Sequence, residues 1–154
     1  MLSMKAWCVM LLVLWVSACA VRPVDTEISD QDLIESESSL LTGVPAADNL
    51  LQQGESARQR GEYGVAVNHL ERGIRMAPRS PALYLALAKT RLAMGEYGSA
   101  AQMAQRTVSL LPAAPRGAEQ TAKAEAWIVI AQSREKQGDT AGAANARANA
   151  QAVW

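Results

Sequence analysis

The stretch GEYGVA at residues 61–66 returns as GEYGSA at residues 95–100, which is 34 residues later. A looser copy, GDTAGA, occupies residues 138–143, one such period plus nine residues further on. A fixed period of this length is typical of a chain built from repeated helical hairpins, which bury their apolar faces against their neighbours. The sequence from residue 47 onward therefore predicts an all-α fold of three stacked units.

Residues on either side of each copy follow the same order. A large residue in the first helix is followed four positions later by a small residue, where the two helices of a hairpin approach closely. A glycine then ends the first helix, and a proline, which cannot continue a helix, closes the first two units. The large and small pairs are Leu50 and Gly54, Tyr84 and Ala88, and Trp127 and Ala131, and the closing prolines are Pro78 and Pro112.

This pattern over residues 47–154 is similar to the tetratricopeptide repeat, and the resemblance implies three helix-turn-helix units in a short right-handed solenoid. We place the units at 47–80, 81–114 and 115–154. The expected helices are 47–60, 63–76, 81–94, 97–110, 118–137 and 140–152. The nine extra residues, near 113–121, predict a longer connection. We expect no seventh helix to cap the stack, and we expect Trp154 to cover its end.

The N-terminus has the pattern of an export signal. Lys5 is the only charge among residues 1–18, and an apolar run and two small residues follow it, as in a secretory signal peptide. The run is too short to span a membrane. The sequence VSAC at residues 16–19 resembles the lipobox of bacterial lipoproteins, which implies cleavage before Cys19 and acylation of that cysteine. Ala20 follows it, and the resemblance then implies anchoring in the outer membrane, facing the periplasm.

Residues 19–46 are predicted to form an acidic, flexible tether behind the lipidated cysteine. Six acidic residues lie between 25 and 37 without a basic one among them, and Pro, Gly and Ser interrupt any long element, which is typical of a solvated linker. A short helix around residues 33–41 that docks on the domain is the alternative. The part from residue 40 onward is mildly basic, so association of the tether with the domain is a further alternative.

The composition argues against an enzyme. The chain has one histidine, His69, and two cysteines, of which Cys8 lies in the signal. This leaves almost nothing for a nucleophile with its base or for a metal site, and we see no Gly-rich phosphate loop. The 15 basic and 15 acidic residues balance, so there is no signal for nucleic acid. We therefore predict no enzymatic activity, cofactor, metal or small-molecule substrate, and a protein as the partner.

Stacked helix pairs form a concave binding surface, which the first helix of each unit lines in tetratricopeptide proteins. The residues that we expect there combine an apolar stripe with flanking charge, which suits a peptide or a partner helix. They are Leu51, Arg58, Leu85, Lys89, Leu92, Ile128 and Gln132. The alternative for Leu51, Leu85 and Ile128 is that they are core residues between hairpins.

The stretches LERGIRMAPRSPALYLALAKTRLAMGEYGSAAQMAQRTVSLL at 70–111 and AEAWIVIAQSREKQGD at 124–139 resemble the tetratricopeptide type of lipoprotein that activates class A penicillin-binding proteins. The resemblance implies a non-catalytic periplasmic protein that activates or scaffolds a bifunctional peptidoglycan synthase. The short tether departs from this pattern. The alternatives are a pilotin-like lipoprotein for secretin or type IV pilus assembly, or another envelope scaffold.

Overall fold

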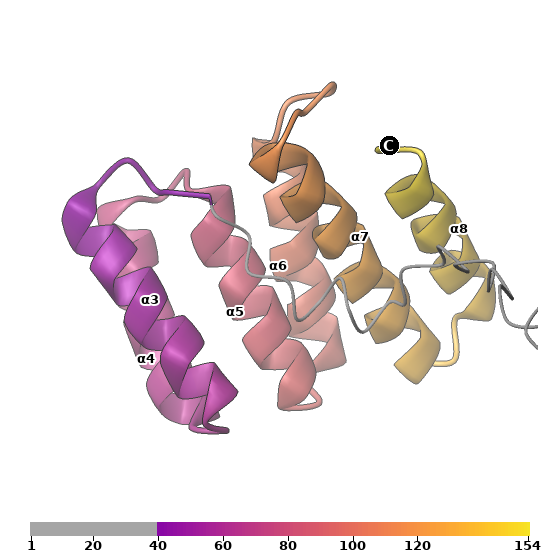
Figure 1. Ribbon diagram of the computed structural model, residues 1–154. Helices are drawn as coiled ribbons and strands as arrows, with labels where there is room; N and C mark the ends of the chain where they lie inside the picture. Colours follow the sequence, from indigo (N-terminus) through magenta and orange to yellow (C-terminus); the bar gives the residue numbers. More distant parts are fainter. Residues whose placement is uncertain (1–39) are drawn as a thin grey trace, which may run out of the picture.

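The computed structural model describes residues 40–154, and every regular element in this part is a helix (Figure 1). The signal peptide, Cys19 and most of the tether lie outside the described residues. The helices are α3 (Pro45–Gln59), α4 (Tyr63–Met76), α5 (Pro81–Ala93), α6 (Tyr97–Leu110), α7 (Ala118–Lys136) and α8 (Thr140–Gln151). Each begins and ends within two residues of its predicted bounds, so the expected all-α fold is confirmed.

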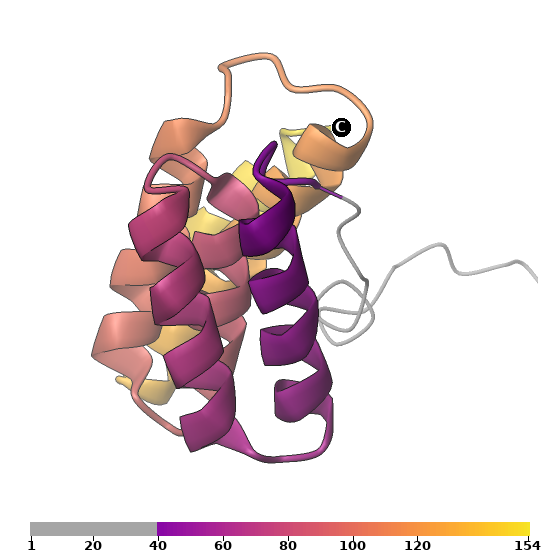
Figure 2. The same ribbon diagram turned by 90° about the vertical axis from the view of Figure 1, so that its left-hand side faces the viewer.

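The helices form three antiparallel hairpins, α3–α4, α5–α6 and α7–α8, stacked side by side (Figure 1). The first helices make one layer, in which α5 contacts both α3 and α7. The second helices α4, α6 and α8 make the other layer, as the turned view shows (Figure 2). We call the side of α3, α5 and α7 that points away from the second layer the inner face.

The connections lie at two opposite edges of the stack. One edge, the turn edge, holds the hairpin turns, where Gly61, Gly95 and Gly138 have φ of 76°, 77° and 83°. Residues with a side chain rarely adopt this left-handed conformation, so glycine is required there. The other edge, the linker edge, holds the α4–α5 and α6–α7 connections and the start of α3 (Figure 1). The long connection predicted between the second and third units is found there.

Small residues set the distance between the two helices of a hairpin. A Cβ atom added at Gly54 of α3 would lie 2.6 Å from Cγ of Leu70 on α4, closer than two carbon atoms can pack. Ala88 and Ala131 hold the equivalent places in α5 and α7, and both are fully buried. The pattern of small residues read from the sequence therefore marks real points of close contact.

Two clusters of buried side chains form the core. One lies between α5, α6 and α7 and includes Leu85, Val129 and Ile130, and the other joins α3, α4 and α5 around Leu70 and Leu83. Both are rich in alanine, which lets the helices pack closely. α5 and α7 are the most buried helices, since α5 lies between the first and third units and α7 packs against both helices of the second unit as well as α8.

One expectation about the ends is corrected, and one alternative is tested only at its last residues. Residues 40–44 are not helical and Leu40 packs against the core cluster of α5–α7, whereas residues 33–39, where most of the alternative helix was placed, lie outside the described residues. The Trp154 side chain is 65% exposed and does not cover the last hairpin. The backbone there is held, since the Trp154 N–H donates to the Gln151 carbonyl at 3.2 Å and Gln120 Nε2 donates to the Val153 carbonyl at 2.9 Å. Among the helices described here, none is long and apolar enough to cross a membrane.

Candidate partner-binding face

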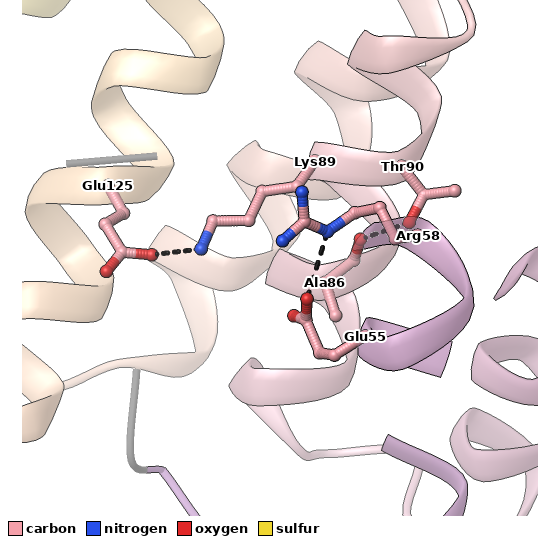
Figure 3. A network of polar contacts seen from close by, with 6 residues as sticks. All are labelled: Glu55, Arg58, Ala86, Lys89, Thr90 and Glu125. Atoms are coloured by element: carbon pink, nitrogen blue, oxygen red, sulfur yellow. Dashed lines mark hydrogen bonds and ion pairs between the residues drawn. The ribbon is translucent and has the colours of Figure 1, made fainter. Parts of the chain in front are cut away.

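A row of polar side chains crosses the inner face from α3 to α7 (Figure 3). On α3, Arg58 Nε donates to Glu55 Oε2 at 3.0 Å. Between α5 and α7, Lys89 Nζ lies 2.8 Å from Glu125 Oε2. Figure 3 shows the Lys89 side chain extended toward Glu125 from the neighbouring helix. The row therefore runs across all three units.

The Lys89–Glu125 pair is buried, with 3% and 0% of the two residues exposed. A buried charge is costly unless an opposite charge and hydrogen bonds compensate for it. The contact joins the second unit to the third, so it favours one arrangement of the two hairpins over others. Beside it, the Thr90 hydroxyl donates to the Ala86 carbonyl at 2.8 Å and is also satisfied.

The seven residues predicted for partner contact divide into two groups. Four of them are half-buried and present part of their side chains to solvent; these are Leu51, Arg58, Leu92 and Gln132. Three are almost fully buried, with Leu85 at 1%, Lys89 at 3% and Ile128 at 3% exposure. The core alternative therefore holds for Leu85 and Ile128, Lys89 is buried as well, and Leu51 keeps part of its side chain at the surface.

The physical reason is visible for Leu85 and Lys89. Leu85 belongs to the core cluster between α5, α6 and α7, which is the alternative that the sequence left open for it. Lys89 is drawn toward the carboxylate of Glu125 on the next unit, a contact that helical spacing within one unit does not show. The side chains of Leu85, Lys89 and Ile128 therefore present almost no surface to solvent.

An open groove of about 550 Å³ lies where residues 40–45 pass α3 and α5. We call it the inner groove; its lining combines exposed leucine with amide, hydroxyl and carboxylate groups. The lining residues include Leu40, Leu41, Leu51, Gln52, Glu55 and Ser56. Leu41 is 76% exposed, and together with Leu40 and Leu51 it gives the groove an apolar part.

Sequence reasoning found Leu51 but missed Leu41 and Gln52 as groove residues. By sequence Leu41 belongs to the tether, and only the apolar pair at positions 40 and 41 indicates that this part of the tether contacts the domain. The groove needs the chain before α3 to run beside α3 and α5, and no local pattern in the sequence specifies that path.

The structure assembles no catalytic group around His69. This residue is half-buried on α4, beside a shallow pocket lined by Gln52, Gln53, Ser56 and Arg60, without a carboxylate. Within residues 40–154, no group of three or more His, Cys, Asp or Glu side chains is placed to hold a metal ion.

Ion pairs concentrate at the turn edge. Arg60 donates to Glu62, and this hydrogen bond holds the pKa of the Glu62 carboxyl below its ordinary value. Arg91 bonds Glu96 and Glu71, and the hydrogen bond with Glu96 is the main cause of its raised pKa. In the third hairpin, a hydrogen bond from Arg147 lowers the pKa of Glu135. Each acid here is thus matched by a base.

Comparison with known proteins agrees with this architecture. A sequence profile of the tetratricopeptide repeat matches residues 57–123. The solved structure of the globular C-terminal domain of P. aeruginosa LpoP is 39% identical in sequence, with a TM-score of 0.63. The match covers 70% of this chain and 97% of that domain. No curated protein matches the chain significantly.

Proposed function

The chain belongs to the tetratricopeptide-repeat family, together with the C-terminal domain of LpoP, and from this premise we propose that it is a non-catalytic binding module for a class A penicillin-binding protein. Cys19 would be lipidated and would anchor it in the outer membrane, facing the periplasm. The observation that carries the proposal is the 39% identity to the LpoP domain over 97% of that domain, together with the sequence resemblance to lipoprotein activators of these synthases.

The inner groove is the contact site that we propose. Its exposed Leu41 and half-buried Leu51 offer apolar surface, and Gln52, Glu55 and Ser56 offer hydrogen-bonding groups along one helix. Such a combination suits an extended segment or a helix of a protein partner. Arg58, Leu92 and Gln132, which are half-buried on α3, α5 and α7, would continue the surface toward α7.

Activation needs a difference in affinity. A bound protein shifts a synthase toward its active state only by binding that state more tightly than the inactive one. We propose that the domain does so through the inner face, while its lipid anchor keeps it in the periplasm. Several acyl chains would hold it stably in the membrane, where one chain would not.

In-cell photocrosslinking tests the identity of the partner. A photoreactive residue replaces Gln52 in the inner groove, and a second protein carries it at Val65, which is 46% exposed on the outer helix α4. We expect a class A penicillin-binding protein to be captured at position 52 and not at position 65. Capture of a secretin or pilus protein at position 52 would replace the proposal with the assembly alternative.

Binding to the purified synthase tests the site. We expect Leu41→Asp to weaken binding about tenfold or more, because it places a charge where apolar surface should be buried. Val65→Asp makes the same change on the outer helix and serves as the matched control. Equal affinity of both variants and the unmodified protein would exclude the inner groove.

A further inference from the structure

Basic and acidic side chains are distributed unevenly over the domain. From residue 40 onward the chain holds 13 basic and 9 acidic residues. Six of the bases contact acidic side chains, mainly at the turn edge and on the inner face. Seven bases form no ion pair within the part of the chain that the structure describes. These are Arg72, Arg75, Arg79, Arg106, Arg116, Lys123 and Lys136.

All of these seven except Lys136 lie at or within about a turn or two of the linker edge. Arg75 and Arg79 flank the end of α4, and Arg106 lies in the last turns of α6. Tyr84 connects them, because its hydroxyl donates to the Pro78 carbonyl at 3.3 Å and its ring lies 5.8 Å from the Arg106 guanidinium. We call these six residues the basic edge.

The α6–α7 connection continues the basic edge. Arg116 lies in this connection, and Lys123 Nζ donates to the carbonyls of Pro112 and Ala113 at 2.8 and 3.2 Å. Three acidic residues accompany the six bases at this edge. These are Glu71, which precedes Arg72 on α4 and pairs with Arg91, Asp48, which accepts from the Thr42 backbone N–H at 2.6 Å, and Glu119 in the first turn of α7. The excess charge of the domain is thus concentrated here.

The acidic tether enters the domain at the same edge. Its six acidic residues end at Glu37, three residues before Leu40, which packs against the core cluster of α5–α7. We propose that tether residues 25–37 dock on the basic edge when no partner is bound. The charges are opposite and nearly equal in number, and the covalent connection gives the tether a millimolar effective concentration at this surface.

Apolar groups at this edge match the tether as well. A cleft of about 560 Å³ between the α6–α7 connection and the C-terminus is lined by Arg116, Lys123, Trp127 and Trp154. The tether carries Leu33 and Ile34 between its acids. An acidic segment with two aliphatic side chains therefore meets a cleft that combines cations with indole rings.

Docking changes how far the domain reaches from a lipidated Cys19. The 20 residues from 20 to 39 extend to about 70 Å at ~3.4 Å each. With residues 25–37 bound, only a few residues remain free, which extend roughly 20 Å. The docked tether would therefore hold the domain close to its membrane, and an anionic partner segment that displaces the tether would release it. The docking itself does not depend on which protein the partner is.

Paramagnetic relaxation measured by NMR tests the contact in the unlipidated chain from residue 19 onward. Cys19→Ser and Gln31→Cys place one spin label between Asp30 and Asp32 of the tether. At 0.01 M salt, where charges act over about 30 Å, we expect amide signals near Arg79, Arg106 and Arg116 to lose about half of their intensity. At 1 M salt, where this distance is about 3 Å, they should recover.

Two charge variants separate a specific contact from mere nearness along the chain. Arg75→Glu with Arg79→Glu changes the basic edge, and Arg60→Glu with Lys136→Glu makes the same change in net charge at exposed positions of the turn edge. We expect only the first pair to abolish the broadening around Arg106 and Arg116. Broadening that is centred on the inner face, or that neither salt nor the first pair alters, would overturn the proposal.

Discussion

Lys89 on α5 and Glu125 on α7 form an ion pair of 2.8 Å in the interior of the domain, where both side chains are almost completely shielded from solvent. The two residues belong to different units and are separated by a hairpin and the long α6–α7 connection. Their contact reports directly on how the second and third units stack. It is therefore the natural place to measure the coupling between units.

Replacement of Lys89 alone should strongly destabilise the domain. Lys89→Met removes the cation from beside a buried carboxylate, and we expect it to lower the free energy of unfolding by about 3 kcal/mol or more. Lys89→Met with Glu125→Leu removes both charges and should unfold within about 1 kcal/mol of the unmodified protein. Urea unfolding of Lys89→Met, Glu125→Leu and the double variant measures the three changes in the free energy of unfolding, which together form a double-mutant cycle. Additive losses would show that the pair does not couple the units.

The close approach at Gly54 gives a second test. In Gly54→Ala the new methyl group would lie 2.6 Å from Leu70 Cγ, so the Leu70 side chain or the α3–α4 spacing must shift, at a cost of about 1–3 kcal/mol. Gly64 is the control, since it is helical and an added Cβ meets no atom within 4 Å. Gly64→Ala should be neutral or stabilise by about 0.5 kcal/mol. Thermal unfolding compares the two; equal effects would contradict the packing argument.

The Arg147–Glu135 contact predicts a local pH effect. Because the hydrogen bond from Arg147 lowers the pKa of Glu135, its contribution to stability is present above the pKa of the unfolded chain and is lost as the pH falls through the folded value. Arg147→Gln should raise the pKa of Glu135 toward its ordinary value. NMR titration of the carboxyl carbons measures this, and the pKa of Glu62, beside Arg60, should stay unchanged.

The two tryptophans of residues 40–154 should respond differently to truncation. Trp154 is 65% exposed, so Trp154→Ala should change the free energy of unfolding by less than about 0.5 kcal/mol. Trp127 packs against the core cluster of α5–α7, and Trp127→Ala should cost about 3 kcal/mol. Denaturant unfolding followed by circular dichroism compares them. A large loss for Trp154→Ala would restore the capping role that the sequence suggested.

Much of the fold was predictable because its determinants are local. Turn glycines, closing prolines and small residues at fixed offsets act within a few positions of the chain, and they placed all six helices within two residues of their observed bounds. Gly54 and Ala131 were identified as contact points for the same reason, since helical geometry relates residues four positions apart.

The candidate site was predicted less completely. Of the residues predicted for partner contact, Leu51 and Arg58 are half-buried, whereas Leu85, Lys89 and Ile128 are buried. Periodicity shows which side of a helix a residue occupies. It does not show whether a neighbouring unit covers that side, because this depends on how closely the units stack.

By itself, the sequence determined the helices, their pairing into hairpins and the separation of an acidic tether from a basic domain, because repeat period, turn residues and charge are properties of short segments. Only the tertiary structure decided that Lys89 meets Glu125, that Leu41 stands beside α3 in a groove, and that the unpaired bases gather at one edge. These features bring together residues that are far apart in the chain. The way in which the three units stack determines where those residues lie.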